Sequence, residues 1–315
     1  MNREWGPYFG DAQREVAAFA RALVEQGGEE LQLVVLDAES ETEAAGALDV
    51  PVTFHRLTFG DIWLRDIAPV FVSRGGELGA LCFRFNGWGN RYHFAGDDEL
   101  AGRIASRVGA TPFSFDWVLE GGAVEHDGRG TLLTTEQCLL HPNRNSGTAP
   151  ARSKAQIGRE LCDAYGADTV IWLGEGLRND HTDGHVDTLA RFIAPSVVLC
   201  MEPAENDPNR EALLAVMATL RSARDAHGKR LEVVTVPSPG AVLDDDGDPM
   251  PASYANFYIA NRCVVVPTYG SPADERALRA FEGLFPKRQV LGLSARAILT
   301  GGGAFHCISQ QQPSL

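Results

Sequence analysis

The segment best suited to chemistry lies close to the C-terminus, where Cys307 follows a run of three glycines at 301–303. Consecutive glycines let the backbone reach positive φ values and approach a ligand closely. A thiol presented beyond such a turn can be a nucleophile when a histidine and a carboxylate from elsewhere in the chain accompany it. A buried core cysteine is the alternative interpretation. The role of Cys307 therefore depends on what the rest of the chain supplies.

Two further stretches place carboxylates beside tryptophan or glycine. Asp66 ends the stretch 61–66, which also contains Trp63 and Arg65, and Glu120 ends an apolar stretch and precedes two glycines. Glycines at that point allow close backbone approach. Each acid also has an ordinary interpretation, because Asp66 could pair with the neighbouring arginine and Glu120 could be a loop carboxylate.

His185 and Asp187 lie two residues apart. We expect a strand over 185–192, in which both side chains project from the same face and can serve one site. The same spacing would suit a metal, but no further pair of histidines or acids has ligand spacing, so we expect no metal. His181 and Asp183 precede this segment and are further candidates, with a loop position as the alternative.

A thiol, an imidazole and several carboxylates together suit nucleophilic attack on a planar cation. The thiolate would attack, the histidine would move protons, and carboxylates would bind the cation in a bidentate way. Guanidinium is the biological cation of that shape. The net charge of −14 agrees with a small cationic substrate. No Lys/Arg cluster indicates nucleic-acid binding and no apolar run is long enough for a membrane span.

The six cysteines are scattered without a C-x-x-C pair. This pattern argues against a zinc site and against a disulfide framework, and no secretory segment is evident at the start. We therefore expect a cytoplasmic protein. The sequence leaves a homo-oligomer open.

Apolar residues at helical spacing predict helices that recur among strands without a shift in composition, which indicates one α/β domain built from repeated modules. The expected helices are 11–26, 98–108, 152–165, 209–226 and 272–285. The expected strands are 31–36, 169–173, 185–192, 197–201, 231–236, 263–266 and 289–293, with a strand-rich segment at 52–85 and a hairpin at 118–140. The acidic run 244–248 lacks the closing glutamate of a calcium loop and is expected to be a solvated turn.

In combination these stretches resemble the agmatine deiminase family of the guanidine-modifying (pentein) superfamily, which includes peptidylarginine deiminases. The matching segments follow one another in order: 61–66, 120–122, 132–140, 143–145, 182–187, 301–303 and 306–308. The resemblance implies a five-bladed α/β propeller with pseudo-fivefold symmetry and a single domain over 1–315. It also implies hydrolysis of a guanidinium to a ureido group, with release of ammonia and without a cofactor.

The resemblance also implies roles for individual residues. Cys307 would be the nucleophile, and His185 would be the acid for departing ammonia and then the base for water. Asp66 and Asp187 would bind the guanidinium nitrogens. Glu120 would either orient His185 or join this clamp.

Two tryptophans are candidates for the walls of the guanidinium slot. Trp63 lies within the first matching segment, and Trp88 lies in a glycine-rich stretch, with core packing as its alternative. The loop 178–183 offers Asp180 and Asp183 but no lysine, which favours a substrate whose far end is cationic, as in agmatine.

Two features depart from the family pattern. Only ten residues precede the first expected helix, so we expect the family's first strand and its apolar Trp-Pro segment to be missing. His181 stands where an acid is usual, which weakens the choice of agmatine. Peptidyl-arginine or another guanidino compound, and transfer of the amidino group to an amine, remain alternatives.

Overall fold

Five units of strand, helix and parallel strand organise the chain, of which the computed structural model describes residues 5–145 and 151–315. Within each unit the two strands are hydrogen-bonded neighbours. The units are β1 (Leu31–Val35), α2 (Ala38–Ala47) and β2 (Val52–Arg56); β4 (Glu77–Arg84), α5 (Asp97–Arg107) and β5 (Thr111–Val118); β7 (Thr131–Thr135), α8 (Lys154–Tyr165) and β8 (Thr169–Leu173); β10 (Val197–Glu202), α9 (Arg210–Ser222) and β11 (Glu232–Pro237); and β13 (Cys263–Thr268), α10 (Asp274–Leu284) and β14 (Gln289–Ser294).

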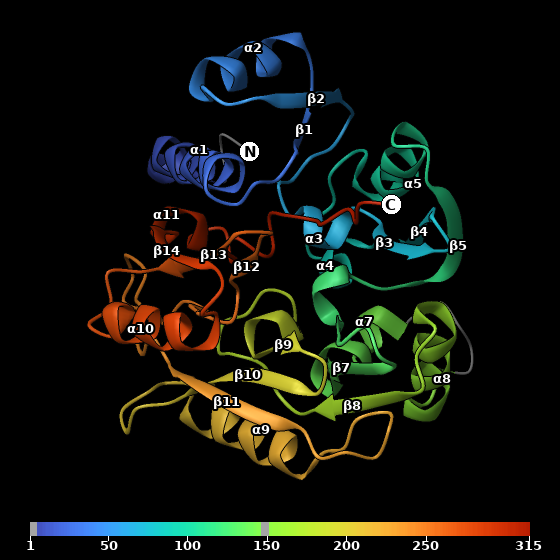
Figure 1. Cartoon of the computed structure of the whole chain (residues 1–315), viewed down its shortest axis with the longest axis vertical. Helices are drawn as coiled ribbons and strands as arrows, with labels where there is room; N and C mark the ends of the chain where they lie inside the picture. The colour runs from blue at the N-terminus through green and yellow to red at the C-terminus, as the bar shows by residue number, and fades with distance from the viewer. Residues whose placement is uncertain (1–4, 146–150) are drawn as a thin grey trace.

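Four of the units carry an additional antiparallel strand before the first parallel one. These strands are β3 (Val70–Arg74), β6 (Glu125–His126), β9 (Ala190–Ala194) and β12 (Tyr258–Ile259). The β1–β2 sheet has two strands within the described residues. The five sheets follow one another around the molecule in chain order (Figure 1). The repeated module that the sequence indicated is therefore strand, strand, helix, strand.

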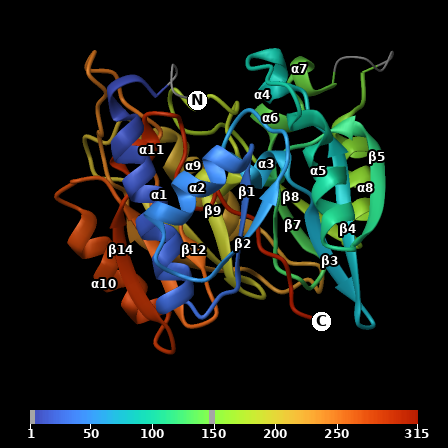
Figure 2. The ribbon, with the colours of Figure 1, turned by 90° about the horizontal axis from the view of Figure 1, so that it is seen from above.

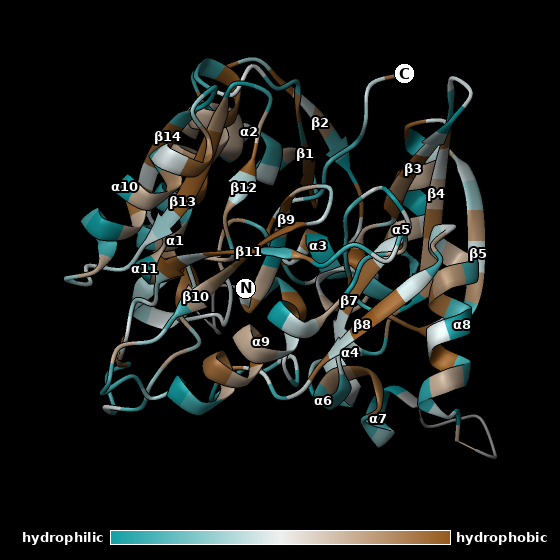
Figure 3. Cartoon of the chain, turned by 60° about the horizontal axis from the view of Figure 1, so that its bottom comes forward, coloured by the Kyte–Doolittle hydropathy of each residue, from teal (hydrophilic) through white to brown (hydrophobic). Residues whose placement is uncertain are grey.

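The helices form where local signals and burial agree. In α8, Ser153 and Gln156 form a reciprocal capping box, and Gly166 ends the helix with φ 62°. The strand β13 is buried along most of its length, whereas α10 buries one side only. Figure 3 shows this contrast, with apolar colouring concentrated on the inner strands and mixed colouring on α10.

The first predicted helix is confirmed as α1 (Phe9–Glu25), but it does not belong to the first unit. It packs against α11 (Arg296–Leu299) and β14 on one side and contacts β1 on the other, so it lies between the fifth and the first sheets (Figure 2). The helix of the first unit is α2, which the sequence analysis missed. That helix buries none of its residues, so its sequence lacks the apolar stripe that indicates an amphipathic helix. The remaining local signal is Asp37, which caps the first turn.

The strand expected over 185–192 is wrong in its first half. Residues Val186–Thr188 form the 3-10 turn η3, and β9 begins at Ala190. Asp187 therefore reaches the site from a turn, and the argument from strand alternation does not explain its position.

The other short elements lie before the first unit or in the connections between strands and helices. They are η1 (Gly6–Tyr8), α3 (Leu64–Ile67), α4 (Gly87–Asn90), η2 (Gly121–Ala123), α6 (Glu136–Leu139) and α7 (Pro142–Asn145). The acidic run 244–248 is an exposed turn, as expected. Among the described residues, no helix combines the length and the apolar character that crossing a membrane requires.

Candidate active site

The glycine run before Cys307 is required by packing against aromatic rings. A Cβ atom on Gly303 would lie 2.6 Å from Cζ3 of Trp63 and 3.1 Å from Sγ of Cys307, and one on Gly301 would lie 2.7 Å from the Trp5 ring. Both ring contacts are shorter than the contacts that real Cβ atoms make in proteins. A side chain at either position would therefore require its neighbours to shift, whereas glycine requires no shift. The close backbone approach expected from the sequence is therefore present.

Two buried polar side chains contact the Cys307 thiol. The Nδ2 atom of Asn256 lies 3.1 Å from Sγ, and Oδ2 of Asp187 lies 3.5 Å from it. The Oδ1 atom of Asn256 accepts hydrogen bonds from the backbone N–H groups of His306 and Cys307. Asn256 thereby fixes the backbone on which the thiol is carried.

The Asp66 carboxylate in the short helix α3 is held on both oxygens. Oδ2 accepts a hydrogen bond from Nε1 of Trp88 at 2.9 Å, and Oδ1 accepts one from the backbone N–H of Gly122 at 2.9 Å. Oδ1 also lies 3.6 Å from Nδ1 of His185. Asp66 and His185 therefore form a buried ion pair when the imidazole is protonated.

The backbone of Gly122 lies where three functional groups converge. A Cβ atom there would be 2.7 Å from Nδ1 of His185, 2.8 Å from Oδ1 of Asp66 and 3.2 Å from Oδ2 of Asp187. The glycines after Glu120 thus provide the room in which these side chains meet, as their position in the sequence suggested.

Asp187 is fully buried and shares its Oδ2 with His306, whose Nδ1 lies 2.7 Å away. Burial raises the pKa of Asp187 to about 6, with Asp66 adding to the rise and His185 opposing it. Burial lowers the pKa of His306 well below its ordinary value, and the guanidinium groups of Arg191 and Arg65 lower it further. His306 is therefore neutral and donates its Nδ1 hydrogen to Asp187.

The negative charges of the site act on both the thiol and the imidazole. Burial, Asp187 and Asp66 together raise the pKa of Cys307 well above that of a free thiol. Burial works to lower the pKa of His185, but Asp66, Cys138 and Glu120 outweigh it and raise that pKa well above its ordinary value. Before a cation arrives, the site therefore holds a neutral thiol beside a protonated imidazole.

Glu120 is fully buried, and its Oε1 accepts a hydrogen bond from Nε of Arg144 at 2.8 Å. Arg144 also donates to Asp183, and Asp183 is further bound by Arg91 and Asn143. Both carboxylate oxygens of Asp183 are thereby engaged. These bonds anchor the loop that carries Asp183, and Asp183 does not line the cavity described below.

A cavity of about 190 Å³ opens in front of the thiol. Trp5 and Trp63 lie along one wall, with ring centroids 6.1 Å apart. The cavity is lined by Trp5, Asp61, Trp63, Asp66, Trp88, Tyr92, Phe94, His181, Thr182, Thr300, Gly301, Gly302, Gly303 and Cys307. Five of the residues singled out from sequence thus face the cavity, namely Trp63, Asp66, Trp88, His181 and Cys307.

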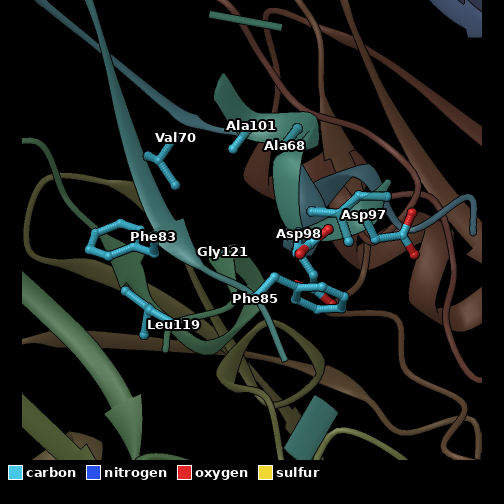
Figure 4. Close-up of a pocket in the computed structure, with 11 residues that line it drawn as sticks. Ala68, Val70, Phe83, Phe85, Asp97, Asp98, Ala101, Leu119 and Gly121 are labelled. Carbon is cyan, nitrogen blue, oxygen red and sulfur yellow. The ribbon is translucent and has the colours of Figure 1, made fainter. Parts of the chain in front are cut away.

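The remaining predicted residues are not part of the cavity wall. His185, Asp187 and Glu120 are buried behind Asp66 and Cys307, and Asp183 is held in its loop. A second void of only about 10 Å³ lies behind Asp66, with Phe83 and Leu119 at one end and Asp97 at the other (Figure 4). Its volume suits a single water at most, so it is not a substrate site.

The sequence analysis missed several residues of this site. Trp5 precedes Gly6-Pro7 and supplies the apolar wall that we expected to be missing. Asn256 carried a readable signal, since it is a lone amide within an apolar stretch at 252–260. His306 had only its position next to Cys307 to indicate a role.

Three groups that can ligate a metal also meet in the described part of the chain. Ligand-type atoms of Glu120, Cys138 and His185 all lie within 4.8 Å of one another. The spacing of these residues in the sequence did not indicate this cluster. Arg144 already provides a cation against Glu120, which makes a second positive charge there unfavourable.

A thiol, a histidine and paired carboxylates at the end of a narrow aromatic cavity define a cysteine-dependent enzyme that acts on guanidino C–N bonds. The chain belongs to the Porphyromonas-type peptidyl-arginine deiminase family, whose model matches residues 1–313. The prediction of this family from the sequence motifs is confirmed.

Similar proteins span most of the chain. The agmatine deiminase of Stutzerimonas stutzeri is 37% identical over 98% of this chain and 89% of its own length. The putative agmatine deiminase of Streptomyces coelicolor is 41% identical over 80% of this chain and 76% of its own.

Solved structures of related enzymes share the fold. The agmatine deiminase of Enterococcus faecalis has a TM-score of 0.89 and 32% identity, covering 98% of this chain and 88% of that one. A cysteine-to-serine variant of the C. jejuni agmatine deiminase with substrate bound has a TM-score of 0.87 and 28% identity, covering 97% of this chain and 88% of that one.

Proposed function

We propose that the protein hydrolyses the guanidinium group of agmatine to N-carbamoylputrescine and ammonia. The observation that carries this proposal is the charge of the cavity. Its wall contains two acids, Asp61 and Asp66, and no lysine or arginine among the described residues. A substrate with a cation at each end fits this wall, whereas the carboxylate of free arginine would meet no opposite charge. Relatives at 34–37% identity over most of the chain are named agmatine deiminase or putative agmatine deiminase, which agrees.

In the first half of the reaction the guanidinium lies between Trp63 and Trp88, with its nitrogens against Asp66. Arrival of this cation offsets the negative charges that keep the thiol of Cys307 protonated, so the thiol proton passes to solvent, where the released ammonia later takes up a proton, and the thiolate remains. The thiolate attacks the guanidinium carbon and forms a C–S bond. His185 gives its proton to the departing nitrogen, which leaves as ammonia, and a thiouronium remains on the enzyme.

The second half of the reaction regenerates the thiol. His185, now neutral, takes a proton from water, and the resulting hydroxide attacks the thiouronium carbon. The C–S bond breaks as the O–H proton of the adduct passes to the departing sulfur, so that the neutral ureido product leaves and the neutral thiol of Cys307 is restored. Asp187 lies beside the sulfur and holds its position during both steps, and His306 in turn binds Asp187. Overall, a guanidinium and water yield a ureido group and ammonium.

The far end of the substrate meets the outer part of the cavity. Tyr92 and Phe94 offer aromatic faces there, and Asp61 offers a carboxylate. We assign Asp61 to the distal ammonium in place of the acids of the loop 178–183, because Asp61 lines the cavity whereas Asp180 and Asp183 do not. Aromatic rings and a carboxylate are the groups that bind an ammonium.

The five units support a five-bladed propeller with one domain over 1–315 and its active site at the centre. Each blade would be a small sheet whose parallel strands are joined by one helix. All six cysteines are free thiols, which agrees with a reducing cytoplasm. The product of the reaction would feed putrescine formation.

The test is product formation on a panel of agmatine, free arginine and a peptide with internal arginine. We expect equal amounts of ureido product and ammonia from agmatine, with kcat/KM at least roughly a hundredfold above that for arginine, which is about 2.7 kcal/mol. Equal values for the two substrates would contradict agmatine as the substrate while leaving deiminase chemistry in place.

A further inference from the structure

Cys138 is a second buried thiol, and it lies next to the catalytic histidine. It is carried by the short helix α6, directly after β7, and its side chain is fully buried. Thr135 caps this helix by accepting a hydrogen bond from the backbone N–H of Cys138, and the same hydroxyl donates to the carbonyl of Gly184 at 2.6 Å. The turn that holds Cys138 is therefore tied to the residue that precedes His185.

The side chains around Cys138 have unpaired polar atoms. Oε2 of Glu120 and both ring nitrogens of His185 are buried and have no hydrogen-bond partner among the described residues. The ligand-type atoms of Glu120, Cys138 and His185 all lie within 4.8 Å of one another. Buried polar atoms without partners are rare and mark groups whose arrangement matters for function.

We propose that Cys138 is a positioning residue for His185, holding its imidazole from the side of Glu120 while the ring serves the reaction at Cys307. This inference rests on the proposed function, because it assigns His185 the work of proton transfer. The Cys138 sulfur lies within 4.8 Å of both the Glu120 carboxylate and the imidazole, and Oε2 of Glu120 forms no hydrogen bond with the ring.

The chemistry of a thiol suits this position. Sulfur is a weak acceptor and S–H a weak donor, so Cys138 supports the ring in both protonation states without taking its proton. Burial raises the pKa of Cys138, which keeps the thiol neutral and adds no second negative charge next to Glu120. The titratable groups that face His185 are Asp66 from α3, Glu120 before η2, Cys138 from α6 and Asp187 from η3.

The experiment compares three variants of the full chain: Cys138→Ala, Cys138→Ser and Cys200→Ala. Cys200 is an equally buried thiol in β10, outside the site, and controls for the loss of a sulfur from the core. We expect Cys138→Ala to lower kcat for agmatine about tenfold or more with KM changed less than about twofold, because proton transfer is impaired while the clamp is intact. We also expect its pH–rate profile to shift, Cys138→Ser to recover part of kcat, and Cys200→Ala to behave like wild type.

A second readout does not depend on turnover. In the Cys307→Ser chain labelled with ¹⁵N-histidine, the His185 signal is assigned by its loss in a His185→Gln variant. We expect the added Cys138→Ala change to lower the titration midpoint of His185 by at least about 0.5 pH unit, since the thiol lies within 4.8 Å of the ring and raises the pKa of His185. An unchanged midpoint, or a Cys138→Ala enzyme with wild-type kcat and pH profile, would overturn the proposal. Failure of wild-type turnover would overturn the proposed function alone.

Discussion

Nε1 of Trp88 donates a hydrogen bond to Oδ2 of Asp66 at 2.9 Å, and the Trp88 backbone has φ 51° where it makes this contact. A non-glycine residue in this region costs about 1–2 kcal/mol, so the packing around Trp88 must hold it there. Oδ1 of Asp66 is bound by the backbone of Gly122. The carboxylate is thus oriented before a substrate enters, and Trp88 serves both as a wall and as a donor to Asp66.

The first prediction concerns pH. Burial raises the pKa of Asp187 to about 6, so the carboxylate that lies against the thiol is lost as pH falls through that value. We expect kcat/KM for agmatine to decline on the acid side of about pH 6, because a neutral Asp187 no longer attracts the guanidinium. An acid limb absent from profiles taken between about pH 5 and 7 would contradict this assignment.

The raised pKa of Asp187 also makes the free energy of unfolding depend on pH. The folded carboxyl keeps its proton up to about pH 6, whereas the unfolded one loses it near 3.8. Its contribution to the free energy of unfolding is therefore present below pH 3.8 and lost as pH rises through about 6. The difference in stability between wild type and Asp187→Asn, followed by denaturant titration across this range, isolates this contribution from those of other groups.

The second prediction tests the glycine run. We expect Gly303→Ala to lower kcat/KM at least about tenfold, because its Cβ would displace Trp63 or the Cys307 thiol by crowding both. Gly283→Ala in α10 is the matched control, since a Cβ there meets nothing within 4 Å. Equal activity of the two variants would show that the loop can move aside.

The third prediction tests the far end of the substrate. Asp61→Asn should raise KM for agmatine about tenfold while changing kcat little, because it removes the charge assigned to the distal ammonium but leaves the reacting end intact. Asp116→Asn removes an exposed charge whose side chain is 94% accessible and controls for net charge. If both variants have the wild-type KM, the ammonium binds elsewhere.

The fourth prediction concerns metals. Glu120, Cys138 and His185 form a set of ligand-type groups, but Arg144 already binds Glu120 through Nε at 2.8 Å. We expect dialysis against EDTA to leave the turnover of agmatine unchanged. Loss of activity in EDTA with recovery on addition of zinc or manganese would favour a metal centre at these residues.

Much of this site could be read from the sequence because the relevant residues lie in short segments beside glycines. The clashes that a Cβ would make at Gly122 and Gly303 explain why glycine marked the site so clearly. Cys307, Asp66 and Trp63 were recognisable from the same segments. The ion pairs of Asp183 could not be predicted, because arginines from two other segments bind its carboxylate and no local pattern reveals them.

What the sequence did not reveal depends on distant packing. Asn256 lies 51 positions before Cys307 and meets it only through the tertiary fold. Helix α2 has no buried face and so produced no periodic signal, whereas α1 has a strong periodic signal and packs between the last sheet and the first. Periodicity identifies an amphipathic helix but not the sheet that the helix covers.

The most direct test of the account is the turnover of agmatine by wild type and by Cys307→Ser, measured as ureido product. The hydroxyl of serine is a far weaker nucleophile than a thiolate at neutral pH. We expect the variant to lose at least about a thousandfold in kcat with an unchanged circular dichroism spectrum and melting temperature. Retention of activity within about tenfold of wild type, in a variant of unchanged fold, would contradict attack by Cys307 on the guanidinium carbon.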